Sequence, residues 1–165
     1  LKNIIVRSMN NLASIFIEKT ILTTRIEVFQ IASVFIKDKK FRYFYKFVKN
    51  NLKHSNNAVE FSVAIKQLFK IVGDSKIILK NDDNNDFLIL NESCLRFLNK
   101  NFDNFVYDIS KNAEFLGFKK SNLEFLCSKY NISFKNDKGL PTSVFKAQKV
   151  FVIGAKMFNL GKDNV

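Results

Sequence analysis

Most of the information on fold class lies in residues 25–54, whose sequence is RIEVFQIASVFIKDKKFRYFYKFVKNNLKH. Apolar residues recur in this segment at steps of three and four, which is the period of an amphipathic helix. They are Ile26, Phe29, Ala32 with Ser33, and Ile36, continued by Tyr43 with Phe44, Phe47 and Leu52. Neither glycine nor proline interrupts the segment. The pattern predicts one long helix or two helices in line, followed by a polar linker at residues 54–57.

The same helical spacing continues on both sides of this segment. On the N-terminal side it predicts a helix over residues 8–20, with a break at residues 21–24. On the C-terminal side we expect helices over residues 59–72 and 92–116, ended by Gly73 and Gly117. Ser121 and Glu124 fit a capping box that begins a further helix, running to about Tyr130. The helix over 92–116 has the most regular apolar stripe, formed by Leu95, Leu98, Phe102, Phe105, Val106, Ile109, Ala113 and Leu116.

Two parts of the chain predict strands. The β-prone runs Lys76–Lys80 and Phe87–Asn91, joined by the polar tip Asn81–Asp86, predict a hairpin with a long loop. The tip lacks the glycine and the later oxygen ligands of a calcium-binding loop, so we expect a solvated turn. Residues 131–135 alternate as a short strand does. Residues 142–158 fit either a helix or a short helix followed by an edge strand, and we favour the strand.

These patterns predict an α+β protein that is mainly helical. It would contain several amphipathic helices, a small β-hairpin at about residues 76–91 and short strands near the C-terminus. We expect a basic, aromatic helical segment at residues 1–54 and an α+β domain at residues 58–165. No transmembrane segment is expected, because the longest uncharged run in the apolar N-terminal part, Val28–Ile36, is far shorter than the roughly 20 residues of a span.

The net charge of +12 is the feature of the composition that bears most on function. The chain has 27 Lys and Arg residues against 15 Asp and Glu residues. A folded domain with such an excess repels itself, and an anionic partner usually compensates for the repulsion. Nucleic acid, anionic lipid and an acidic protein are the candidates, and we favour nucleic acid.

The strongest candidate site is a cluster of basic and aromatic residues at positions 37–49. On a helix, Lys39, Arg42, Lys46, Lys49 and Lys53 would form one basic ridge that contacts phosphates. The interleaved rings either pack into the core, which we favour, or stack on unpaired bases. A second basic group lies in the C-terminal third, where lysines far outnumber acidic residues. The candidate RNA-binding residues are Lys37, Lys39, Lys40, Arg42, Lys46, Lys49, Lys53, Lys119, Lys120, Lys146 and Lys149.

Motifs for catalysis or metal binding are not evident. His54 is the single histidine, and it is far in sequence from the two cysteines, Cys94 and Cys127, so we expect no metal at these three residues. Both cysteines lie in apolar helical patterns and are expected to be reduced core thiols of an intracellular protein. The five glycines do not form a phosphate-binding loop. The sequence predicts a protein that is not an enzyme and binds no cofactor.

The composition, with 19 Phe, no Trp and lysine far ahead of arginine, resembles that of proteins encoded in A/T-rich organelle genomes. Many of these are ribosomal proteins. The sequence begins at Leu1, so either residues before it are missing or translation starts at a non-standard codon, which some organelle codes allow. We therefore expect a structural component of a mitochondrial ribosome in the organellar matrix, binding rRNA and neighbouring ribosomal proteins. The alternatives are an accessory subunit of a respiratory or ATP-synthase complex, docked on a membrane-complex surface, and a viral or bacterial nucleic-acid-binding protein.

Overall fold

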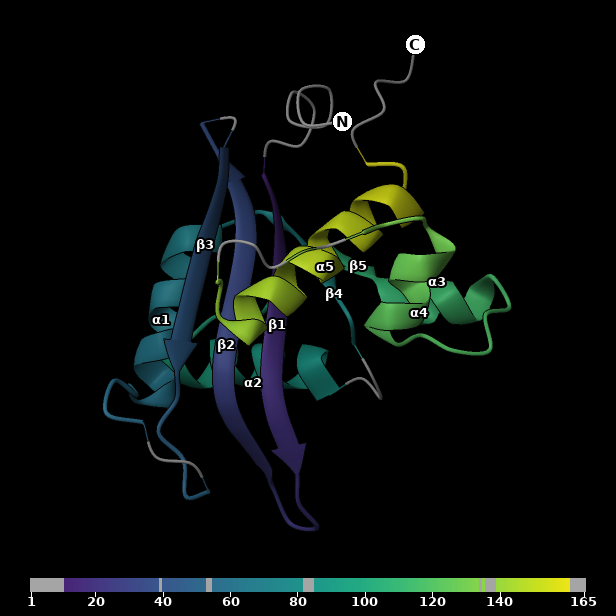
Figure 1. Ribbon diagram of the computed structural model, residues 1–165. Helices are drawn as coiled ribbons and strands as arrows, with labels where there is room; N and C mark the ends of the chain where they lie inside the picture. The colour runs from purple at the N-terminus through teal and green to yellow at the C-terminus, as the bar shows by residue number, and fades with distance from the viewer. Residues whose placement is uncertain are drawn as a thin grey trace.

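The computed structural model describes residues 11–38, 40–52, 55–81, 85–133, 135 and 139–160. In this part of the chain a mixed sheet of five strands has the order β3-β2-β1-β4-β5 (Figure 1). Strands β1, β2 and β3 form an antiparallel meander, and β4 and β5 run parallel to β1. The strands are β1 (Leu12–Ile21), β2 (Ile26–Lys37), β3 (Lys40–Phe47), β4 (Lys76–Leu79) and β5 (Val106–Asp108).

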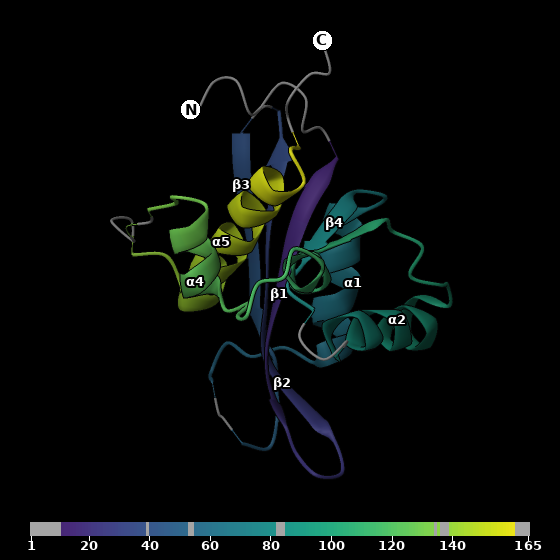
Figure 2. The same ribbon diagram turned by 90° about the vertical axis from the view of Figure 1, so that its right-hand side faces the viewer.

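Helices cover both faces of the sheet. Figure 2 shows α1 (Phe61–Val72) and α2 (Asn85–Leu98) on one side, with α4 (Leu123–Lys129) and α5 (Thr142–Met157) on the other. The short α3 (Ile109–Phe115) packs on the side of α5. Because side chains alternate along a strand, each central strand contributes to two cores. The core under α5 includes Leu12, Val34 and Ile78, and the core under α1 includes Ile15 and Ile77.

Within residues 25–54, strands β2 and β3 pair antiparallel, so the prediction of a long helix, and with it of a mainly helical fold, is wrong. The reason is the burial of β2 on both faces: Ile31, Ala32, Ser33 and Val34 are all 0% exposed. A strand covered on both sides has no polar face, and therefore reads as a continuous apolar run. Such a run also contains apolar residues at helical spacing, so the period alone does not distinguish the two structures. The helix expected at residues 8–20 is wrong for the same reason, since Leu12–Ile21 is strand β1.

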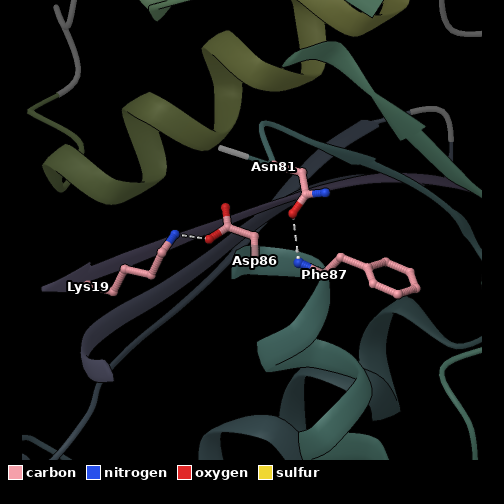
Figure 3. A network of polar contacts seen from close by, with 4 residues as sticks. All are labelled: Lys19, Asn81, Asp86 and Phe87. Carbon is pink, nitrogen blue, oxygen red and sulfur yellow. Dashed lines mark hydrogen bonds and ion pairs between the residues drawn. The ribbon is translucent and has the colours of Figure 1, made fainter. Parts of the chain in front are cut away.

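The hairpin expected at residues 76–91 is only half present. Lys76–Leu79 is a strand, but it pairs in parallel with β1 and β5. The second predicted strand is the beginning of α2, which buries Ile89 and Leu90 and leaves Phe87 and Leu88 exposed. The Asn81 side chain accepts a hydrogen bond of 2.9 Å from the Phe87 backbone N–H, next to the ion pair of Asp86 with Lys19 (Figure 3). These contacts fix the start of α2 where a turn was expected.

The apolar stripe of residues 92–116 does not lie on one helix. Helix α2 ends at Leu98, and the chain then forms β5 and α3. Phe102 and Ile109 are buried, but Leu95 is 49% and Phe105 61% exposed, so the predicted common face is wrong. Asn99, just after α2, has a φ of 52°, and Asn in this left-handed conformation ends a helix as glycine does.

Other predicted elements are confirmed. Helix α1 lies within residues 59–72 and is followed by Gly73, whose φ is 50°. Helix α4 lies where expected, although its cap is Asn122, whose side chain accepts from the Phe125 N–H, and not Ser121.

The C-terminal strands are not present among the described residues. Residues 142–157 form one helix, α5. It contacts the sheet on one side and α4 on another, so apolar residues are spread around the helix and its period was hard to recognise. The pairing of β1 with both β2 and β4 means that residues 1–54 and residues 58–165 contribute strands to one sheet.

Candidate nucleic-acid interface

Strand β3 forms one edge of the sheet and places two kinds of side chain on its two faces. Its sequence, KFRYFYKF, alternates between them as a strand requires. Phe44 is buried in the core under α1, so this face carries Lys40, Arg42 and Lys46. The Phe41 ring packs edge-on against Phe151 of α5, with 5.4 Å between ring centroids, so the other face is that of α5. The α5-side face carries the aromatic row Phe41, Tyr43, Tyr45 and Phe47.

The basic side chains of this hairpin are open to solvent. Lys37, Lys40 and Arg42 are exposed, and Lys46 is half-buried. Lys49 follows the strand and forms an exposed ion pair with Glu60, at 2.9 Å. In sequence, residues 28–59 contain seven Lys and Arg residues and a single carboxylate, Asp38. This segment therefore contributes +6 of the net charge of +12, on less than a quarter of the chain.

The aromatic row is only partly covered by α5. Phe41 is 36%, Tyr43 38% and Tyr45 45% exposed. Helix α5 lies across the middle of the sheet, over β1 and β2, and contacts the row at Phe41 (Figure 1). The Tyr45 and Phe47 rings meet edge-on at 6.3 Å between centroids. Exposed rings in a strongly basic segment are the combination that single-stranded nucleic acid binds.

A groove of about 820 Å³ runs along the start of β3 and joins the two faces at the sheet edge. It is lined by the exposed rings of Phe41 and Tyr43, by the cations Lys37 and Arg42, and by one carboxylate, that of Asp38. Helix α1 contributes Lys70 and Ile71 to the opposite wall. The groove therefore presents cations and ring faces together at one end of the hairpin.

The structure changes which of the predicted cations act together. Lys39 and Lys53 lie outside the described residues, and no helix exists to place Arg42, Lys46 and Lys49 on one ridge. Lys40, Arg42 and Lys46 share a strand face instead. Lys70 and Tyr45 were not predicted. The aromatic residues at positions 41, 43, 45 and 47 do have the two-residue period of a strand, which is the signal that identifies the row.

The second predicted basic group does not join this surface. Lys119 and Lys120 are exposed in the connection before α4, which lies away from β3 (Figure 1). The Lys146 Nζ lies 5.2 Å from the ring centroid of Phe16, and the Lys149 Nζ lies 3.5 Å from Oε1 of Glu124. A hydrogen bond to its own backbone, and then the Lys149 ammonium, lower the pKa of the Glu124 carboxyl. Lys146 and Lys149 therefore have contacts inside the fold, while Lys119 and Lys120 remain open.

A second concave region, of about 600 Å³, lies beyond the carboxyl end of β4. Its charged lining is balanced, with Lys19, Lys80 and Lys146 against Glu18, Asp86 and Glu124. Lys19 and Asp86 are largely buried and form an ion pair with each other (Figure 3). This mixture of charges creates no field for an anion comparable to that of β3.

The remaining candidate residues for chemistry are separated. Both cysteines are free and buried, as predicted, and burial raises the pKa of both the Cys94 and the Cys127 thiol. His54 lies outside the described residues. Among the residues that are described, no three His, Cys, Asp or Glu side chains gather as a metal site requires. None of the described helices combines the length and the apolar character needed to cross a bilayer.

Comparison of the chain with known protein families gives no match, and no characterised protein is similar to it in sequence at a significant level.

Proposed function

We propose that this protein is a structural, non-catalytic component of a ribonucleoprotein and binds RNA through the exposed edge of its sheet. The observation that carries the proposal is the arrangement of side chains on β3. This edge strand carries cations on one face and partly exposed rings on the other. Phosphate contacts by lysine and arginine release counterions and supply most of the affinity of such an interface. The net charge of +12 supports a polyanionic partner.

The particular assembly we propose is a mitochondrial ribosome. A composition with 19 Phe, no Trp and abundant Lys and Asn is typical of A/T-rich organelle genes, among which ribosomal proteins are common. In that setting rRNA would cover the β3 edge, and neighbouring ribosomal proteins would contact other surfaces.

A second candidate function is favoured by a different surface. Phe105, beside β5, is 61% exposed, and Phe115, at the end of α3, is 87% exposed. Exposed large apolar residues mark protein contacts where they form one contiguous patch. An accessory subunit of a respiratory or ATP-synthase complex would use such residues for docking. Purification of the tagged protein from its source separates the two candidates, because the first predicts co-purifying rRNA and the second predicts membrane-complex subunits.

The direct test of RNA binding replaces three cations of one strand face, Lys40, Arg42 and Lys46, by Gln. The salt dependence of binding to a single-stranded RNA is then measured. Each lost phosphate contact lowers the slope of log K against log salt concentration by about 0.7, so the triple variant should lose roughly two units of slope. Folding should be almost unaffected, since isolated surface charges contribute little to stability.

A matched control removes the same charge elsewhere. Lys100, Lys111 and Lys129 are exposed, belong to no part of β3 and do not line the groove beside it. Their triple replacement by Gln should keep the slope of the unsubstituted protein. Equal losses in both triple variants would mean that net charge alone attracts RNA. An unchanged slope in the β3 variant would make β3 a solvated face and the proposal wrong.

A further inference from the structure

We propose that the β3 surface binds an unpaired RNA segment, whose bases stack on the rings of Tyr43 and Tyr45. This inference rests on the proposed function and names the kind of RNA that the surface takes. Its starting observation is that the two rings lie next to each other on one face of an edge strand and are 38% and 45% exposed.

The geometry of the strand suits stacked bases. Alternate residues on one face of a strand are about 6.6–6.8 Å apart, since each residue advances the chain by about 3.3–3.4 Å. Successive bases in a stack rise by about 3.4 Å, so neighbouring rings are spaced by about two base steps. Two bases of a splayed, unpaired strand can therefore each meet one ring. Such stacking is tolerant of sequence, because every base has a flat face.

The cations are placed to hold the backbone of the same RNA segment. Lys40, Arg42 and Lys46 project from the opposite face of β3, and no further strand of the described sheet lies outside β3. The Val59 backbone pairs with the edge at Phe47 and Lys49, so the open part lies along residues 40–46. An RNA backbone that follows this part is within reach of the cations, while its bases turn over the aromatic row. Lys70 extends the basic lining across the groove to α1.

A double helix does not fit this arrangement. The bases of a duplex are stacked on each other, so their flat faces are covered and a duplex would offer the rings only its ends. A protein strand paired to the β3 edge would compensate the charges of Lys40 and Arg42 only if it carried acidic side chains opposite them, and it would leave the exposed rings without a partner. The exposed cations therefore favour a single-stranded polyanion over both alternatives.

The test uses the full chain with Tyr43 and Tyr45 both replaced by Leu, and a control with both replaced by Phe. Phe keeps the aromatic face and removes the hydroxyl. The probes are a 12-nucleotide oligouridylate and a blunt RNA duplex of 12 base pairs, at one fixed salt concentration. The Leu variant should bind the single strand about tenfold more weakly per ring, and the Phe variant should bind almost normally. Neither variant should change the affinity for the duplex.

Two further readouts separate stacking from charge and from folding. The salt slope of the Leu variant should equal that of the unsubstituted protein, because no phosphate contact is lost. The chain has four Tyr and no Trp, so stacking should appear directly as quenching of tyrosine emission by the oligouridylate, and the Leu variant should lose that quenching. Equal urea midpoints for the Leu and Phe variants would exclude misfolding as the cause.

The outcomes distinguish this inference from the proposed function. The stacking inference is wrong if the Leu variant binds the single strand with unchanged affinity. It is also wrong if the Leu variant loses equal affinity for the single strand and for the duplex. If the Lys40, Arg42 and Lys46 variant still loses salt slope in that case, RNA binding by β3 stands without it. If that variant also binds normally, the proposed function fails as well.

Discussion

At the scale of single residues, the closest packing between a helix and the sheet is at Gly154 of α5. A β-carbon on Gly154 would overlap Cγ2 of Ile78, which is fully buried in β4. Gly154→Ala gains about 1 kcal/mol of helix propensity, but overpacking a rigid core costs about 1–3 kcal/mol. We expect a net loss of up to about 2 kcal/mol in the free energy of unfolding, measured by urea denaturation. In an Ile78→Ala background the same substitution should become neutral or stabilising, and a loss of the same size there would place its cause elsewhere.

The two thiols make a second prediction at this scale. Cys94 is 0% and Cys127 8% exposed, and burial raises the pKa of each thiol above its ordinary value. A raised pKa means less thiolate at pH 8, and the thiolate is the reactive form. Both should react with a disulfide reagent much more slowly in the native protein than in urea. Rapid labelling of either thiol under native conditions would contradict its position in the core.

At the scale of elements, β3 has one core residue, Phe44, between two exposed neighbours, and a pair of substitutions can measure the difference. Phe44 is 7% exposed under α1, while the next residue, Tyr45, is 45% exposed. Phe44→Ala should lower the free energy of unfolding by about 3–5 kcal/mol, as large-to-small core substitutions do. Tyr45→Ala should cost less than about 1 kcal/mol, because it removes a partly solvated ring. Similar costs for the two substitutions would be inconsistent with the alternation of the strand.

The elements that sequence patterns predicted correctly are those with one solvated face. Helix α1 shows its helical period because Lys66 and Lys70 are exposed while Leu68 and Phe69 are buried. Strand β2 has no such contrast, so its period is hidden. The sequence did contain one signal for the turn between β2 and β3, which is Asp38. This residue has a φ of 53°, and Asp is one of the few residues that adopt this conformation readily.

The end of α2 at Leu98 was missed for a related reason. The chain has only five glycines, and asparagine takes their place after three helices. Asn99, Asn131 and Asn159 all have a positive φ, between 50° and 52°. Asparagine tolerates the left-handed conformation better than other residues with a side chain. In a sequence with so many asparagines, the individual stops could not be separated from the background by composition.

At the scale of the whole molecule, the sequence predicted the charge of the candidate site but not its shape. The basic and aromatic residues at positions 37–49 were identified from composition alone. Their grouping into a cationic face and a ring face depends on the strand, on the cover that α5 gives to Phe41, and on the place of β3 at the sheet edge. Lys70 joins the surface through tertiary folding only, since it belongs to α1.

The net charge of +12 leads to a last prediction about stability in salt. Without RNA, salt should raise the melting temperature, because it screens repulsion among the excess cations. With the oligouridylate at about 100 times its Kd in low salt, linkage should add about 2.7 kcal/mol, or about 5–10 °C for a chain of this size. Salt weakens RNA binding steeply, so the melting curves with and without RNA should converge as salt increases. The Lys40, Arg42 and Lys46 variant should show a smaller RNA increment at every salt concentration, and an increment that stays constant with salt would argue against binding through phosphates.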